Sequence, residues 1–320
     1  MSTSGGTRAI VAALLANLGI AATKFIAFAF SGASSMLAEA IHSLADSINQ
    51  ILLLVGGRKA LKAADIKHPF GYGRERYVYA FVVSIILFTV GGVFALYEGY
   101  EKLLHPHALE VWWLPMTVLA VSIVLESFSL RTALREAAPA KGRASWGSFI
   151  RHAKAPELPV VILEDTAALL GLIFAFFGVG LTALTGNSVF DAIGTMLIGA
   201  LLVVVAIVLG IETKALLVGE GASAGDVEAI EVAILAGSEA ENIIHMKTLY
   251  LGPDELMVGA KLAFSPKKTL ATVASDIDAI EARIRAAVAS ARIIYIEPDV
   301  QRAAKKVTTN TDAIVLKGLE

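Results

Sequence analysis

The stretch from Ser34 to Gly57, SSMLAEAIHSLADSINQILLLVGG, is apolar and long enough to cross a bilayer, yet it carries Glu39, His42, Asp46 and Asn49. Their spacings of three, four and three residues place all four on one face of a helix. An ionisable side chain at bilayer depth costs roughly 2.5–3.5 kcal/mol on insertion scales, so such residues usually face the interior of a bundle and mark an ion path. The stripe therefore predicts a membrane helix with a polar site on its inner face.

The composition also indicates a membrane protein. Of 320 residues, 56% are hydrophobic and only 18% are charged, which is too apolar for an ordinary soluble domain. The chain has no cysteine, so disulfides, thiolate zinc sites and cysteine nucleophiles are excluded, and any metal must bind through oxygen and nitrogen. The formal net charge of −2 says little about partners, and no concentrated basic patch indicates nucleic acid.

Residues 1–220 are expected to form a transmembrane domain of six helices, each crossing needing about 20 residues. Lys and Arg gather in the connectors after the second and fourth segments, and the positive-inside rule then places both connectors and both chain ends in the cytoplasm. The expected location is the cell (inner) membrane. The six segments lie near residues 9–30, 34–57, 77–103, 111–134, 158–184 and 188–212.

Residues 221–300 have a different pattern, which predicts a compact α+β domain. DVEAIEVAILAG and TLATVASDIDAIEARIRAAVAS have helical periodicity, while IIHMKTLYLG, ELMVGAKLAF and ARIIYIEPD have the pattern of strands. Their order along the chain is helix, strand, strand, helix, strand (αββαβ). Residues 301–320 are expected to be a weakly ordered polar tail.

His42 and Asp46 are the first candidate metal ligands, because a His and an Asp at i and i+4 supply neighbouring nitrogen and oxygen donors to one cation. The fifth segment supplies Glu164 and Asp165, which stand side by side in an apolar run. Adjacent helical residues point about 100° apart, so we expect one of them to be a ligand and the other a helix contact or supporting group. This mixed nitrogen and oxygen set suits Zn²⁺, with Mn²⁺, Fe²⁺ or Cd²⁺ as alternatives.

Structural roles are favoured for the remaining polar residues and glycines of the spans. Glu126 and Asp191 are interpreted as packing or capping groups, and Lys24 as a cation that snorkels to the interface. Five glycines are expected to let the fifth and sixth helices approach closely, as small residues do in membrane bundles. They are Gly171, Gly178, Gly180, Gly194 and Gly199.

Several of these features together resemble the cation diffusion facilitator family of divalent metal transporters, in its zinc-transporting branch. They are MLAEAIHSLADS, the following HPFGYGRERY from His68 to Tyr77, the six spans, and LLVGEGAS before a small αββαβ domain. The resemblance implies a homodimer with ferredoxin-like cytoplasmic domains. It also implies export of divalent metal, usually zinc, from the cytoplasm in exchange for protons.

The resemblance can be carried over to individual residues. The family takes two transport-site ligands from the second helix, matched by His42 and Asp46, and two from the fifth, of which Asp165 matches one. Four residues before Asp165 stands Val161, which cannot bind metal, so Glu164 or a water is expected to complete the site. The implied partners are a second copy of the chain, the transported metal, protons and lipid, with no nucleic acid. The chain is not expected to be an enzyme or to bind an organic cofactor.

Exchange of metal for protons also follows from the ligand chemistry, because ligands must lose protons to bind metal. Two other functions would use similar residues. A metal-gated cation channel would pass metal without proton exchange, and an intramembrane metal-dependent hydrolase would need a general base, such as Glu164, beside a metal-bound water. Proton-coupled uptake into sealed vesicles separates the three.

Overall fold

The computed structural model describes residues 3–106 and 111–301, without the side chains of residues 3–16. The chain divides into two compact units. One unit runs up to Glu220 and includes Tyr250–Asp254, and the other comprises Gly221–Leu249 and continues from Glu255. Of the predicted polar tail, all but Gln301 lies outside the described residues.

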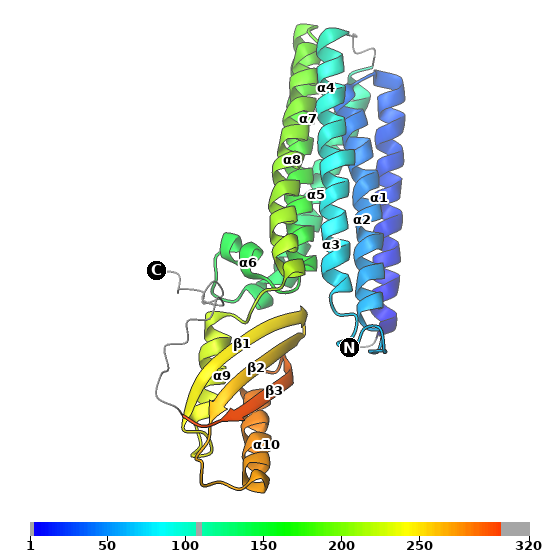
Figure 1. The fold of residues 1–320 in the computed structure, drawn as a ribbon. Helices are drawn as coiled ribbons and strands as arrows, with labels where there is room; N and C mark the ends of the chain where they lie inside the picture. The colour runs from blue at the N-terminus through cyan, green and yellow to red at the C-terminus, as the bar shows by residue number, and fades with distance from the viewer. Residues whose placement is uncertain (1–2, 107–110, 302–320) are drawn as a thin grey trace. The chain divides into compact units, whose positions relative to one another are not determined.

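The first unit is a bundle of long helices that lie side by side (Figure 1). Each predicted span coincides with a long helix to within a few residues, except that the first, fourth and sixth helices extend further. The third long helix consists of three consecutive pieces, α3, η1 and α4. The elements are α1 (Thr3–Ser31), α2 (Ser34–Ala60), α3 (Glu75–Ile86), η1 (Leu87–Val93), α4 (Phe94–Leu104), α5 (Trp113–Lys141), α7 (Glu157–Thr185) and α8 (Val189–Val218).

Four of the described helical stretches are both long and apolar enough to cross a membrane. They are Glu75–Leu104, Trp113–Lys141, Glu157–Thr185 and Val189–Val218. The 27 residues of α2 would also reach across, at about 1.5 Å each, but its polar stripe lowers its mean hydropathy. In α1, the part with described side chains, Asn17–Ser31, is apolar but shorter.

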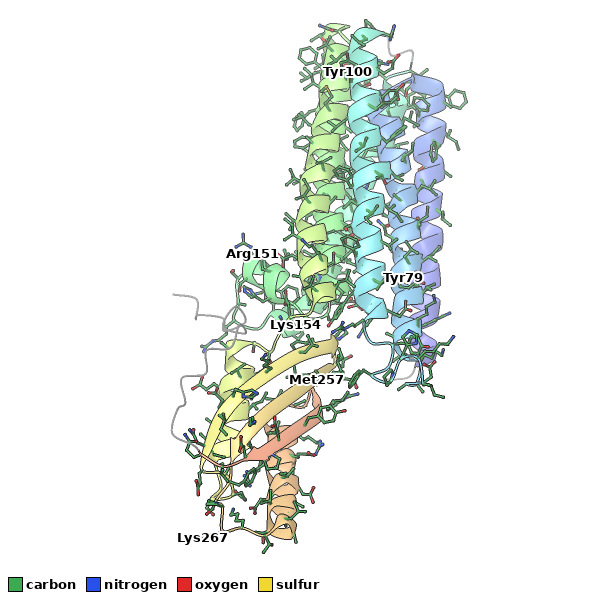
Figure 2. All side chains as sticks on the ribbon, viewed as in Figure 1. Tyr79, Tyr100, Arg151, Lys154, Met257 and Lys267 are labelled. Carbon is green, nitrogen blue, oxygen red and sulfur yellow. The ribbon has the colours of Figure 1, made fainter. Side chains whose placement is uncertain are left out.

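The third long helix has tyrosines near both of its ends. Tyr79 and Tyr100 are labelled at these positions in Figure 2. At about 1.5 Å per residue the interval between them is roughly 30 Å, which matches the thickness of the hydrocarbon core. Amphipathic aromatic side chains favour the two membrane interfaces, so this helix has the dimensions of a membrane span.

Two features of the bundle were not predicted. The first is η1, a π-helical segment with the sequence LFTVGGV. A Cβ on Gly92 would lie only 2.7 Å from Cγ2 of Val203 on α8, so the absence of a side chain permits close contact here. The second is α6 (Trp146–His152), which Ser145 caps by accepting a hydrogen bond from the amide of Ser148 at 3.1 Å. Seven residues are too few to produce a clear periodicity.

The expected close approach of α7 and α8 is confirmed for two of the five glycines. A Cβ on Gly178 would lie 3.0 Å from the carbonyl oxygen of Phe190, and a Cβ on Gly194 would lie 2.9 Å from that of Phe174. In both cases the neighbour is backbone, which cannot move aside as a flexible side chain can.

For the other three glycines the nearest neighbour is on a different helix. Gly180 faces a methionine of α5, and Gly199 lies against the backbone of α4. Gly171 leaves room for the carboxylate of Glu39, whose Oε1 would lie 2.7 Å from an added Cβ. The expectation was wrong for Gly180 and Gly199, because composition shows that a helix carries small residues but not which neighbour they meet.

The elements after Glu220 follow the predicted αββαβ order. They are α9 (Ala224–Leu235), β1 (Asn242–Gly252), β2 (Glu255–Ala263), α10 (Leu270–Ala287) and β3 (Ala291–Asp299). The sheet order is β1-β2-β3, and β2 pairs in parallel with β3, with Val258 opposite Ile294. Parallel neighbours require a crossover connection, which α10 provides.

An Arg283–Glu239 ion pair joins α10 to the segment after α9. The two terminal nitrogens of Arg283 donate to the two carboxylate oxygens of Glu239, at 2.9 and 3.0 Å. The remaining guanidinium donor, Nε, binds the carbonyl oxygen of Ala233 at 2.9 Å. The hydrogen bonds from Arg283 to the Glu239 carboxylate lower the pKa of Glu239, because they stabilise its charged form.

The glycine contacts generate a paired prediction for two positions of α7 that face different helices. Gly178→Ala should lower the free energy of unfolding by about 1–3 kcal/mol, because its Cβ would press on the α8 backbone. Gly180→Ala should be neutral or stabilise by about 0.5–1 kcal/mol, because its Cβ would be 3.6 Å from a methionine methyl group. Unfolding titrations in detergent measure both changes. Equal effects would show that α7 and α8 are not in close contact at Gly178.

Candidate functional site

The polar stripe of α2 faces the interior of the bundle, as predicted. Glu39, His42 and Asn49 have relative exposures of 0%, 1% and 0%. The side chain of Asp46 is 16% exposed. Helices α1, α3, α7 and α8 pack against α2, so these groups are surrounded by protein and not by lipid.

His42 and Asp46 lie one helical turn apart, with 3.5 Å between Nδ1 of the imidazole and Oδ1 of the carboxylate. Neither ring nitrogen of His42 has a hydrogen-bond partner among the described residues, and the same holds for Oδ1 of Asp46. Buried polar atoms are normally satisfied, because an unmatched one loses its hydration without compensation. These atoms are therefore suited to a further ligand.

The two acids of α7 contact different helices. Oε1 of Glu164 accepts a hydrogen bond from Nδ2 of Asn49 on α2, at 2.6 Å. Oδ2 of Asp165 accepts one from the hydroxyl of Ser129 on α5, at 2.9 Å. Their divergence follows from the angular step between adjacent helical residues. The structure therefore assigns a helix contact to each of the two carboxylates.

The carboxylate of Asp46 lies in the electrostatic field of three other acids, Glu164, Glu126 and Asp165, and of one cation, Lys24. The balance around it is therefore negative. In the described part of the chain, however, no three His, Asp or Glu side chains are close enough together to hold a metal ion. The predicted ligands comprise a close pair on α2 and two separately anchored acids on α7.

Val161, the position that lacks a ligand, faces an apolar cluster. It packs with the buried side chains of Ala133 and Ala137 on α5 and of Phe149 on α6. A polar side chain here would have to replace these contacts. The local packing therefore agrees with the apolar residue that the sequence places one turn before Asp165.

Lys24 does not snorkel, contrary to the expectation from sequence. Its ammonium group is 3.0 Å from Oε2 of Glu39 and 2.7 Å from the hydroxyl of Ser43, and its exposure is 1%. The short connection around Gly32 makes α1 and α2 a hairpin, which brings positions at similar distances from the turn together. The sequence could have indicated this pair, because Lys24 and Glu39 lie at similar distances from the turn. The sequence of α1 considered alone does not show it.

Asp191 of α8 caps the start of α2, as the capping interpretation predicted. One carboxylate oxygen accepts from the amide and hydroxyl of Ser34, at 2.8 and 3.0 Å. The other accepts from the amide of Ser35, at 3.3 Å, and from its hydroxyl. A helix N-terminus has free amides and a positive partial charge, so a buried carboxylate is stabilised there.

Comparison with known proteins adds independent information. A family model described as a cation efflux transmembrane domain matches residues 10–218, which include every candidate ligand. The human "Proton-coupled zinc antiporter SLC30A9, mitochondrial" is 39% identical over 198 residues, which are 61% of this chain and 35% of that protein.

Two further relatives come from a plant and a bacterium. "Metal tolerance protein C4" of Arabidopsis thaliana is 29% identical over 262 residues, 81% of this chain and 57% of its own. "Cation-efflux pump FieF" of Shewanella oneidensis is 31% identical over 173 residues, 54% of this chain and 55% of its own. The chain thus spans less than two thirds of the length of each of these relatives.

The buried ion pair generates a stability prediction. Lys24→Met leaves the Glu39 carboxylate buried without its cation, so it should lower the free energy of unfolding by about 3–5 kcal/mol. The double variant Lys24→Met/Glu39→Gln leaves neither charge unpaired and should recover most of that loss. Unfolding titrations in detergent measure both. A double variant no more stable than Lys24→Met would contradict the pairing.

Proposed function

The chain belongs to the cation efflux family, and on this premise we propose that it is a membrane transporter that exports a divalent metal cation, Zn²⁺ foremost, from the cytoplasm in exchange for protons. The observation that carries the proposal is the excess of buried carboxylates around the His42–Asp46 pair. Lys24, the cation in their field, is already engaged by Glu39 and Ser43. Uncompensated carboxylates inside a bundle are costly, so the site requires a cation or protons.

The proposed metal ligands are His42, Asp46 and Asp165. The unsatisfied atoms of His42 and Asp46 fit this assignment. Ser129 binds one oxygen of Asp165 and leaves the other for the ion. Either the second oxygen of Glu164 or a water completes the sphere, since Asn49 already binds Oε1 of Glu164. Since no three such groups lie close enough to hold an ion among the described residues, binding by all of them would require α7 and α2 to approach each other.

Proton exchange follows from the same ligands. Imidazole binds metal through a neutral nitrogen, and carboxylates bind it in their ionised form, so metal and protons compete for the same atoms. The names of the relatives, a zinc antiporter and a cation-efflux pump, favour exchange over the channel and hydrolase alternatives.

The architecture proposed with this function has six membrane spans, α1 and α2 completing the set. The second unit is proposed to be a ferredoxin-like domain in the cytoplasm, with both chain ends on the same side, and the transporter to be a homodimer. The αββαβ order and three-stranded sheet of the second unit support its assignment as a ferredoxin-like domain. The proposed location is the cell (inner) membrane. Since the human relative is named mitochondrial, membrane fractionation is the deciding measurement.

Removing one ligand tests the transport site. Asp46→Ala and Asp165→Ala should each abolish zinc-dependent proton flux in proteoliposomes, because each removes a charged ligand. Glu136→Gln is the matched control, since Glu136 is an exposed acid near the end of α5. Size-exclusion chromatography checks that each variant is folded. Transport at the parental rate by either alanine variant would show that the residue is not a ligand.

A binding measurement tests whether Glu164 is a metal ligand or a helix contact. If Glu164 binds the ion, Glu164→Gln should weaken zinc affinity about as much as Asp165→Asn does. If it only joins α7 to Asn49, stability should fall while affinity changes little. Zinc titration in detergent, combined with an unfolding titration, separates these results.

The imidazole in the stripe predicts metal selectivity. Nitrogen donors suit Zn²⁺, whereas an all-carboxylate site suits harder cations such as Mn²⁺. His42→Asp should therefore narrow the preference for Zn²⁺ over Mn²⁺, measured by competition between the two ions in proteoliposomes. An unchanged ratio would remove His42 from the ligand set.

A further inference from the structure

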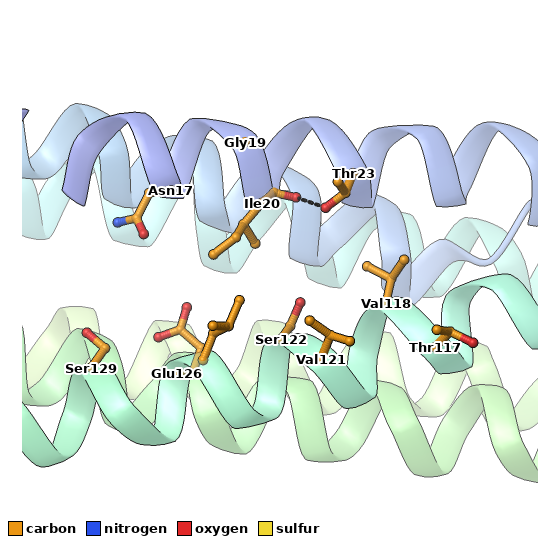
Figure 3. A pocket seen from close by; sticks show the side chains of 11 residues that line it. Asn17, Gly19, Ile20, Thr23, Thr117, Val118, Val121, Ser122, Glu126 and Ser129 are labelled. Atoms are coloured by element: carbon orange, nitrogen blue, oxygen red, sulfur yellow. Dashed lines mark hydrogen bonds between the residues drawn. The ribbon is translucent and has the colours of Figure 1, made fainter. Parts of the chain in front are cut away.

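A cavity of about 690 Å³ lies between α1 and α5, outside the ligand set described above. Figure 3 shows side chains of the two helices facing each other across it. Its apolar lining includes Ile20 of α1 and Val118, Val121 and Leu125 of α5. The volume is large enough for an ion together with several waters, since one water occupies about 30 Å³ in the liquid.

Polar groups from both helices also line this cavity. Apart from one amide nitrogen, their side chains present oxygen atoms, the donors that hydrated divalent cations prefer. An acyl chain would gain nothing from such groups. They are Asn17 and Thr23 of α1 and Thr117, Ser122, Glu126 and Ser129 of α5.

Glu126 is the charged group of this lining, and no hydrogen bond or ion pair engages it among the described residues. In Figure 3 its carboxylate points across the cavity toward α1, on the side of Asn17. The charged groups acting on it are Lys24 of α1, Asp165 of α7 and Glu39 of α2. Because Glu39 and Ser43 hold the ammonium of Lys24, Glu126 has no cation of its own.

Ser129 belongs both to the lining of the cavity and to the surroundings of the proposed site. This residue lines the cavity, and its hydroxyl donates to Oδ2 of Asp165 at 2.9 Å. Glu126 also contributes to the field at Asp46. The charge of a cation held at Glu126 would therefore act on two of the proposed ligands, Asp165 and Asp46.

Building on the proposed transport function, we propose that this cavity is an aqueous vestibule in which Glu126 binds the hydrated divalent cation on its way to or from the transport site. Its carboxylate attracts the ion and the neutral oxygens around it hold the hydration shell. A cavity lined by one sign of charge with low-dielectric walls concentrates counter-ions, so loss of that charge should lower capture more than turnover.

The first test asks whether the cavity contains water. The chain has no cysteine, so single cysteines can be labelled without background. Val121 lines the cavity and Val124 does not, although their exposures are 55% and 54% and they share α5. In proteoliposomes, Val121→Cys should react with a charged, water-soluble thiol reagent and Val124→Cys should not. Equal lack of reaction would show that lipid fills the cavity, which overturns the proposal.

The second test measures zinc capture at Glu126. Glu126→Gln should raise the zinc concentration for half-maximal uptake roughly tenfold with little change in maximal rate. Glu126→Asp, which keeps the charge, and Glu136→Gln, which removes an acid elsewhere on α5, should stay near the parent. If Glu126→Gln and Glu136→Gln have the same half-saturation, the vestibule role is wrong. If the unmodified protein transports no zinc, the proposed function is wrong instead. The cysteine-labelling result does not depend on zinc transport.

Discussion

The constraint on which the bundle depends is that every buried carboxylate needs a donor, a cation or a proton, because the bilayer supplies no water to solvate it. Four acids meet this constraint within the chain. Asp191 binds the start of α2, Glu39 binds Lys24, Glu164 binds Asn49 and Asp165 binds Ser129. Asp46 and Glu126 differ from these four, because neither accepts a hydrogen bond from the described residues. The acids without a hydrogen bond are thus the two proposed to meet the transported ion.

These polar contacts also fix the orientation of α2. Its first turn is bound to α8 through Asp191, its second turn to α1 through Glu39, and its central part to α7 through Asn49. A helix held by directional contacts on three neighbours cannot rotate freely, unlike one packed only by apolar side chains. His42 and Asp46 lie between the last two of these contacts. Two of the proposed ligands are therefore carried by a helix whose rotation is restricted by directional contacts.

Features that depend on local pattern could be predicted from sequence, and features that depend on the choice of neighbour could not. The six long helices and the αββαβ order follow from apolar runs and periodicity, and the inward stripe follows from the spacing of its residues. The Glu39 partner of Lys24 was missed because the snorkelling prediction was made from the sequence of one helix alone. The two residues come together only because α1 and α2 form a hairpin. Likewise, the cavity beside Glu126 depends on the distance between α1 and α5, which cannot be predicted from the sequence of either helix.

The apolar Val161 fits a transport site better than a storage site. Replacing one of four protein ligands with a valine leaves three protein groups and a place for a water or Glu164 in the proposed coordination sphere. Closed sites with four protein ligands are typical of structural zinc, whereas sites with an open position exchange ligands readily. A transported ion must bind well enough to enter and loosely enough to leave. A site formed by His42, Asp46 and Asp165, with protons competing for the same atoms, meets both conditions, and the Ser129 and Asn49 contacts hold the α7 acids in place when the ion has left.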